Sequence, residues 1–178
     1  MEFAPMPSTI LDRFISPASM MDAEQELLAL GVDAVPILAS VLTGQAKNEF
    51  GISYRALGLP LRCALEVARR LGAVARPLES LLRVELHAGN FVAAMALGEL
   101  GSVDDQTVEE LAGHLDYVTN CTNGFDRVPD LTCEAAVALI KLGQETHPAV
   151  TTALMLSDRA AADFARAKAF LRRRERSL

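Results

Sequence analysis

The stretch AEQELLALGVDAVPILASVL, residues 23–42, decides the fold of this chain. Apolar residues recur in steps of three and four on both sides of a glycine, with Leu27, Leu28 and Leu30 before it and Val35, Leu38 and Leu42 after it. That spacing is typical of one face of an α-helix. Gly31 supplies the left-handed residue that ends a first helix, and Pro36 is tolerated in the first turn of a second. The stretch therefore predicts two antiparallel helices joined by a tight turn.

Three later segments repeat this arrangement: ALEVARRLG-AVARPLESLL, AAMALGELG-SVDDQTVEELAGHL and EAAVALIKLG-QETHPAVTTALML. The four punctuating glycines each follow a leucine, and they are Gly31, Gly72, Gly101 and Gly143. A proline stands five residues after three of them, at Pro36, Pro77 and Pro148, whereas Gln106 replaces it in the third segment. A single helix pair cannot bury both of its apolar faces, so neighbouring pairs are expected to stack on a continuous core.

This Leu-Gly pattern, with a short turn and then Ala/Val-x-Pro-Leu or its equivalent, resembles the HEAT-like repeat family over roughly residues 20–157. The resemblance implies an all-α fold, a short right-handed α-solenoid of about four antiparallel helix pairs whose second helices line a concave side. Armadillo-like and other helical-hairpin arrays stay open as alternatives. We expect one domain over 1–178: an N-terminal segment 1–19, repeats 20–157 and a basic capping helix 158–178. Ser157 or Asp158 would begin that helix, and Phe164 and Leu171 mark its buried stripe.

Composition supports a helical domain in a reducing compartment. Of the 178 residues, 51% are hydrophobic and only 5% aromatic with no Trp, which favours close helix-on-helix packing. Three cysteines fit no CxxC pair, so we expect Cys63 and Cys133 to be buried and Cys121 to be the exposed thiol. The sequence has no signal-peptide pattern and no run of about 18 uncharged apolar residues, so we expect a cytoplasmic protein without a membrane partner.

Charge is unevenly spread along the chain. The formal net charge is −6, yet residues 159–178 carry seven Lys/Arg against two Asp/Glu. An acidic body disfavours a nucleic-acid partner, because sequence-independent affinity for the phosphate backbone comes from Lys and Arg. It favours a partner protein with a basic surface. We interpret the basic tail as a solvated helix end that complements the helix dipole.

The sequence offers little chemistry. It has neither GxGxxG nor GxxxxGK[ST], and its three histidines form no HExxH or HxxxH pair, so we expect no cofactor, no metal site and no enzymatic activity. Glu110 and His114 are four residues apart and share a helix face. That pair could orient an imidazole for acid–base work, but no nucleophile or oxyanion donor stands nearby in the sequence. An ordinary surface pair is the favoured interpretation.

Two irregular stretches interrupt the repeats. Residues 44–60 contain Phe50, Tyr54 and Arg55, and 119–130 contain Phe125 and Asp126. Loops of this length are usually functional or mobile. For the first, we favour a connector with Phe50 and Tyr54 packed on neighbouring helices over a displayed loop; for the second, display and anchoring of Phe125 stay equally open.

Acidic residues gather on the second helix of the third segment, where the resemblance points side chains toward the concave face. They are Asp104, Asp105, Glu109, Glu110 and Asp116, of which the first two also favour the helix dipole. The predicted partner-binding set combines residues of this helix and of the two irregular stretches. It consists of Tyr54, Arg55, Glu109, Glu110, His114, Asp116, Tyr117, Phe125 and Asp126.

These features predict a non-enzymatic protein-binding module. Small, acidic, cytosolic HEAT-like proteins are similar to bacterial immunity proteins that neutralise a cognate toxin domain, and this is the specific function we expect. HEAT-like enzymes, the alkylpurine DNA glycosylases and bilin lyases, are one alternative, and a scaffold without a dedicated ligand is another. The glycosylase alternative fits poorly because it needs a basic groove with aromatic side chains.

Overall fold

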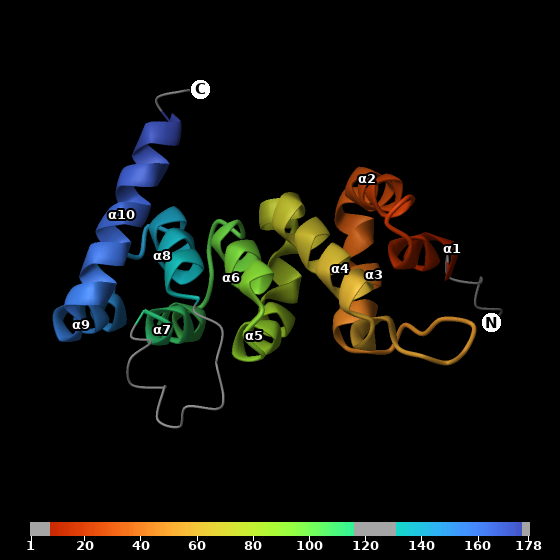
Figure 1. The fold of residues 1–178 in the computed structure, drawn as a ribbon, viewed down its shortest axis with the longest axis horizontal. Helices are drawn as coiled ribbons and strands as arrows, with labels where there is room; N and C mark the ends of the chain where they lie inside the picture. Colours follow the sequence, from red (N-terminus) through yellow and green to blue (C-terminus); the bar gives the residue numbers. More distant parts are fainter. Residues whose placement is uncertain (1–7, 116–130, 176–178) are drawn as a thin grey trace.

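A computed structural model describes residues 8–115 and 131–175, and the described chain is built of helices (Figure 1). Within these ranges the only β-pairing is an isolated antiparallel bridge between Lys47 and Ser53. The all-α prediction is thus confirmed for the described residues. The elements in order are α1 Ser8–Asp12, η1 Arg13–Ile15, α2 Met20–Leu30, η2 Gly31–Asp33, α3 Ala34–Leu42, η3 Tyr54–Ala56, α4 Gly58–Leu71, η4 Gly72–Leu78, α5 Glu79–His87, α6 Phe91–Gly98, α7 Asp105–Gly113, α8 Thr132–Lys141, α9 Pro148–Leu156 and α10 Asp158–Glu175.

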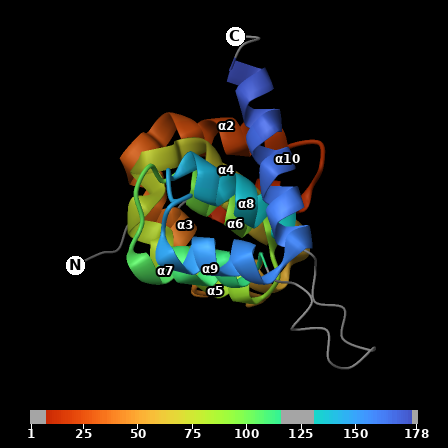
Figure 2. The same ribbon diagram turned by 90° about the vertical axis from the view of Figure 1, so that its left-hand side faces the viewer.

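Helices that alternate along the chain lie side by side. We call α2, α4, α6 and α8 the first row, because each contacts the next, and α3, α5, α7 and α9 the second row for the same reason. The view along the array in Figure 2 separates α2, α4 and α8 from α5, α7 and α9. The last helix, α10, packs against both α8 and α9 and ends the array.

The corners between the rows fall at the predicted glycines. Gly31, Gly72, Gly101 and Gly143 all have positive φ, from 57° to 76°, which L-residues with a side chain rarely adopt. The position of the proline after the corner varies from one pair to the next. Pro36 lies in the first turn of α3 and Pro148 begins α9, whereas Pro77 lies within the 3₁₀ segment η4, before α5 begins.

One hydrophobic core runs from α1 to α10. Its fully buried members come from nearly every helix, including Phe14, Leu27, Leu38, Leu65, Leu82, Leu97, Leu111 and Leu139. The predicted capping helix α10 contributes Phe164, and the Ser157 hydroxyl accepts a hydrogen bond from the Ala160 amide at its start. Each pair therefore depends on its neighbours to cover its apolar face.

By length and composition alone, one stretch of the described chain, Met20–Leu42, could cross a membrane. Here it is two helices, α2 and α3, joined at Gly31.

Two helices of the first row, α6 and α8, come very close to each other. A Cβ atom built on Gly98 would lie 2.7 Å from Ala138 Cα and 2.9 Å from Ala138 Cβ, closer than real Cβ contacts come. The neighbouring positions are small as well, with Ala94 and Ala135 fully buried. Two helix backbones can come this close only where side chains are absent or small.

We predict that Gly98→Ala lowers the free energy of unfolding by about 1–3 kcal/mol, because α6 and α8 must move apart. A glycine-to-alanine change at an unstrained helical position normally stabilises by about 0.4–1 kcal/mol. Gly113→Ala is the matched control, since Gly113 also ends a helix, α7, and has no atom within 4 Å of its built Cβ. Urea unfolding followed by circular dichroism measures both; equal stability of the two variants would contradict the close contact.

Candidate functional site

The connection between α3 and η3 is an ordered loop. The Asn48 side-chain oxygen accepts hydrogen bonds from the Phe50 and Ile52 amides, both at 3.0 Å, and the Asn48 amide donates to the Ile52 carbonyl at 3.0 Å. Gly51, with φ of 75°, donates its amide to the Asn48 carbonyl at 2.9 Å and makes the turn at the tip. We call residues 44–57 the 44–57 loop.

Tyr54 holds this loop from beneath. Its side chain is 1% exposed, and its hydroxyl donates to the Asp12 carboxylate on α1. Burial first, and the hydrogen bond to Asp12 second, raise the pKa of Tyr54 above its ordinary value, so the hydroxyl stays protonated. Tyr54 therefore ties the loop to the N-terminal helix and offers no surface to a partner, which removes it from the predicted contact set.

Arg55 ties the other side of the loop to α5. Its guanidinium lies 2.8 Å from the Glu85 carboxylate, and its Nε donates to the same oxygen at 2.9 Å. The Glu85 side chain is 4% exposed and Arg55 is 38% exposed. Arg55 thus anchors the loop while part of its side chain still reaches solvent.

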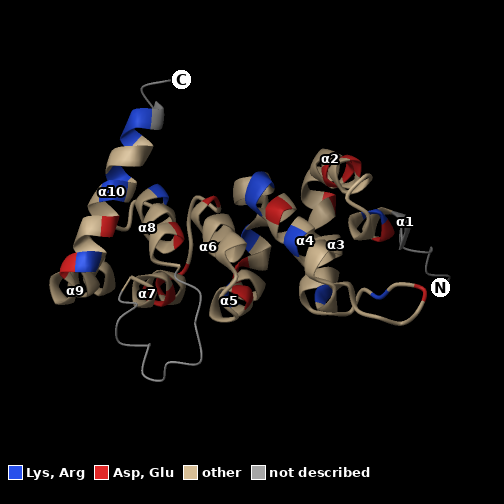
Figure 3. Ribbon diagram, viewed as in Figure 1, with Lys and Arg blue, Asp and Glu red and all other residues tan. Residues whose placement is uncertain are grey.

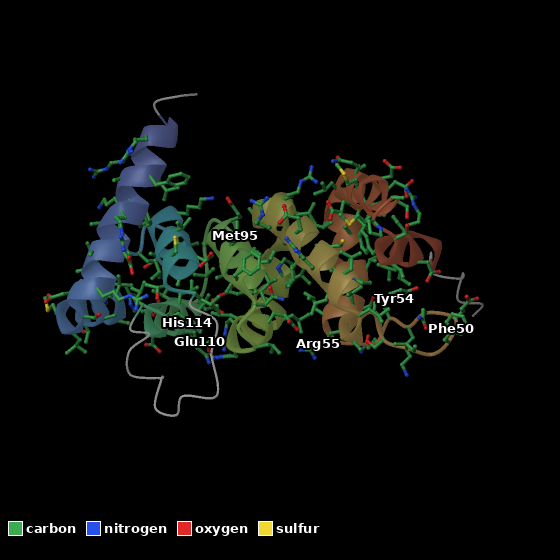
Figure 4. The ribbon with its side chains drawn as sticks, viewed as in Figure 1. Phe50, Tyr54, Arg55, Met95, Glu110 and His114 are labelled. Atoms are coloured by element: carbon green, nitrogen blue, oxygen red, sulfur yellow. The ribbon has the colours of Figure 1, made fainter. Side chains whose placement is uncertain are left out.

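Phe50 points away from the body of the protein (Figure 4). Its side chain is 77% exposed, and Ile52 beside it is 46% exposed. The favoured interpretation, that both aromatic residues pack on neighbouring helices, holds for Tyr54 and is wrong for Phe50. Sequence reasoning found the loop but could not assign one aromatic to the core and one to solvent.

Glu110 on α7 is held by side chains of α5 and of α7 itself. Its carboxylate accepts from Arg83 Nε at 2.9 Å and from the Gln106 amide nitrogen at 3.1 Å, and it lies 3.2 Å from His87 Nε2. These contacts hold the Glu110 carboxylate, and its charge also acts on His114. With its side chain 14% exposed, Glu110 joins α5 to α7.

A buried carboxylate that sequence reasoning missed positions the start of α7. Glu79, 8% exposed, accepts hydrogen bonds from the Asp104 amide at 2.8 Å and from the Thr107 hydroxyl. Glu79 thus satisfies a backbone N–H that the start of α7 would otherwise leave unpaired. The exposed acidic residues of α7 are then Asp105 and Glu109, four apart and on one helix face.

Four of the predicted contact residues lie outside the described residues: Asp116, Tyr117, Phe125 and Asp126. The described members of the set fall in two places. Tyr54 and Arg55 support the 44–57 loop at the N-terminal end, whereas Glu109, Glu110 and His114 belong to α7 and its C-terminal end (Figure 4). Both groups reach the same helix, α5, Arg55 through Glu85 and Glu110 through Arg83 and His87.

Cys63 lies beside the carboxylates of Glu24 and Glu66. Burial raises the pKa of the Cys63 thiol to about 12, with Glu24 adding to the shift, so Cys63 is a protonated core residue at neutral pH. Cys133 is exposed, which corrects the prediction that it is buried. In residues 8–115 and 131–175, no three His, Cys, Asp or Glu side chains gather as a metal site would require.

Positive charge gathers on α10 at the C-terminal end of the array (Figure 3). Acidic residues neutralise part of it, because Asp163 contacts Arg159 and Arg166, and Lys168 lies 2.8 Å from Glu145. The N-terminal end is different, since α2 carries the acidic residues Asp22, Glu24 and Glu26. The charge asymmetry of the sequence thus becomes an asymmetry between the two ends of the array.

The chain was compared with known proteins in three ways. No protein-family model matches it. No curated protein matches it. No solved structure matches it.

We predict that His114 makes the fold less stable as the pH falls. Burial, and then the charge of His87, lower the pKa of His114 below 6.5, against the opposing influence of Glu110. The unfolded chain therefore takes up this proton more readily than the folded one, and stability is lost as the pH falls below about 6.5.

Urea unfolding at about pH 7 and about pH 5 tests this. The loss of unfolding free energy between the two should be smaller in His114→Gln than in the unaltered chain. His147→Asn is the control, because asparagine keeps a side-chain acceptor at the start of α9, where His147 Nδ1 accepts from the Ala149 amide. An equal loss in all three proteins would contradict the role of His114.

Proposed function

We propose that this chain is a non-enzymatic binding module for a protein with a basic surface, built as a short right-handed α-solenoid of about four antiparallel helix pairs of the HEAT-like type. The two rows of alternating helices, the glycine corners and the terminal helix α10 support the solenoid. Such arrays present extended surfaces on a rigid frame, and this suits recognition of a macromolecule. We place the complex in the cytoplasm.

This proposal depends on one observation: the 44–57 loop is ordered and exposes Phe50 at its tip. When a large apolar side chain on a flexible loop binds a partner, the loop and the side chain lose conformational entropy. Phe50 avoids much of this cost, because Asn48 orders the tip and Tyr54 and Arg55 hold the base. Exposed, pre-ordered aromatic residues are frequent anchors of protein interfaces. Phe50 and Ile52 therefore replace Tyr54 as the proposed apolar contacts.

Asp105 and Glu109 are the proposed acidic contacts. Both are exposed on one face of α7, whereas Glu110 is already engaged by Arg83 and His87. Exposed charges of one sign steer an oppositely charged partner and raise the association rate, whereas a neutralised carboxylate contributes little to steering. Glu110 thus leaves the proposed contact set for a structural reason.

An immunity protein is the specific form of this proposal. Its support is the resemblance of the repeat, the acidic body and the small size, not a sequence motif. It requires a partner that is toxic on its own. An enzyme would instead hold a small molecule or a nucleic acid, and a scaffold without a dedicated ligand would hold no stoichiometric partner.

The proposal predicts one stoichiometric, salt-sensitive protein partner. We would capture it from the source organism's lysate at about 0.05 M salt, identify it and measure its binding in purified form at about 0.05 M and about 0.5 M salt. Asp105→Lys with Glu109→Lys should slow association about tenfold at low salt. Phe50→Ala should speed dissociation by about tenfold or more.

Matched controls are Asp22→Lys on α2 and Phe170→Ala on α10, since both side chains are exposed and lie on other elements. The controls should change both rates by less than about twofold. For the immunity form, the identified partner expressed alone should arrest growth, and co-expression of this chain should restore it. No enriched protein over a mock column, or a partner whose rates ignore the acidic and aromatic changes alike, would contradict the proposal.

A further inference from the structure

A cavity of about 350 Å³ opens on the first row, between α2, α4 and α6. Its apolar walls come from all three helices and consist of Met20, Leu59, Phe91, Val92 and Met95. Phe91 is 45% exposed at its edge, and the thioethers of Met20 and Met95 are adaptable packing partners for an aromatic ring. A closed apolar cavity of only ~150 Å³ holds benzene in another protein, so the volume here leaves room for a benzyl group.

Charged groups of both signs also line this cavity. Glu24 and Glu66 supply carboxylates, and Arg62 supplies an exposed guanidinium. The Glu24 side chain is 14% exposed, and the guanidinium of Arg70 stands 3.7 Å from its carboxylate, so its charge is weakly compensated. An occupant with an apolar tip and flanking charges of both signs would match this lining.

The tip of the 44–57 loop has that composition. Phe50 is the apolar tip, with Lys47 and Glu49 as exposed charged neighbours and Ile52 beside it. Glu66 is already paired with Arg69, so Lys47 matches the carboxylate of Glu24, and Glu49 matches Arg62. The backbone that carries the ring is already ordered, because the Asn48 side chain accepts hydrogen bonds from the Phe50 and Ile52 amides.

Phe50 cannot fill the cavity of its own chain in this conformation. Figure 4 places Phe50 at the outer end of the loop, beyond Tyr54, and Met95 on α6 in the middle of the array. The 77% exposure of Phe50 agrees with this separation. A ring from a second copy meets no such restriction.

We propose that Phe50 of one copy inserts into the cavity between α2, α4 and α6 of a second copy. The contact joins two different surfaces, so every copy carries one tip and one cavity, and the contacts either close into a small ring or dimer or continue into an open chain. One ring with a few charged neighbours buries far less area than a permanent dimer does, so the association is weak and dynamic. It goes beyond the proposed function, and a heterologous partner seated on Phe50 would compete with it.

Sedimentation equilibrium of the purified chain, from about 10 µM to about 1 mM, tests the contact without any partner. The unaltered chain should show a rising average mass. Phe50→Ala, which keeps the cavity, and Met95→Lys, which keeps the tip and places a charge in the cavity, should each weaken self-association at least tenfold. Phe170→Ala should behave as the unaltered chain, because Phe170 is an exposed ring (60%) on α10, away from both surfaces.

Mixing the two defective variants gives the decisive result. Phe50→Ala supplies an intact cavity and Met95→Lys an intact tip, so the mixture should form a one-to-one complex that neither variant forms alone. Circular dichroism and thermal unfolding identify a variant that has lost its fold; Phe91→Lys, at the exposed edge of the cavity, then takes the place of Met95→Lys. A monomeric chain over the whole range, undiminished self-association of Phe50→Ala, or a mixture that stays monomeric would overturn the proposal. Because no partner is present, these outcomes leave the proposed function to its own experiment.

Discussion

The close approach of α6 and α8 at Gly98 and Ala138 is the constraint on which the middle of the array depends. Backbones at this distance leave no room for water or for a larger side chain, so the first row is fixed at its centre. Gly101 then turns the chain into α7, and Glu79 holds the start of α7 through the Asp104 amide and the Thr107 hydroxyl. Packing fixes the first row at its centre, and a buried carboxylate joins α5 to α7 within the second row.

The helices and corners could be predicted because their causes are local. Leucines at three- and four-residue steps make a helical stripe wherever they occur, and a glycine after such a stripe ends the helix by adopting positive φ. Gly31, Gly72, Gly101 and Gly143 all do so. Gly98 gave no such signal, because its role comes from Ala138, 40 positions away in a different helix, and only the packed structure brings the two together.

The candidate surface was only partly predictable, because side chains at nearby positions differ in whether they are buried or exposed. The loop was recognisable from Gly44, Gly51 and Phe50. Tyr54, however, is buried, and its hydroxyl donates a hydrogen bond to Asp12, far away in the sequence. In the same way Glu110 was predicted as a contact, and Arg83 and His87 on α5 engage it. In both cases the partner lies across the array, and ion-pair and hydrogen-bond partners of this kind do not follow any sequence period.

The central claim is that the 44–57 loop, which we propose as a contact surface, is an ordered part of the fold held by the same core as the helices. Amide hydrogen exchange of the native chain, followed residue by residue by NMR, tests this most directly at Phe50, Ile52 and Tyr54, whose amides all donate hydrogen bonds. We predict that all three exchange slower than unprotected amides by about a hundredfold or more, with Tyr54 the slowest. Exchange of the Phe50 and Ile52 amides at the unprotected rate, while those of α4 and α6 stay protected, would contradict the claim.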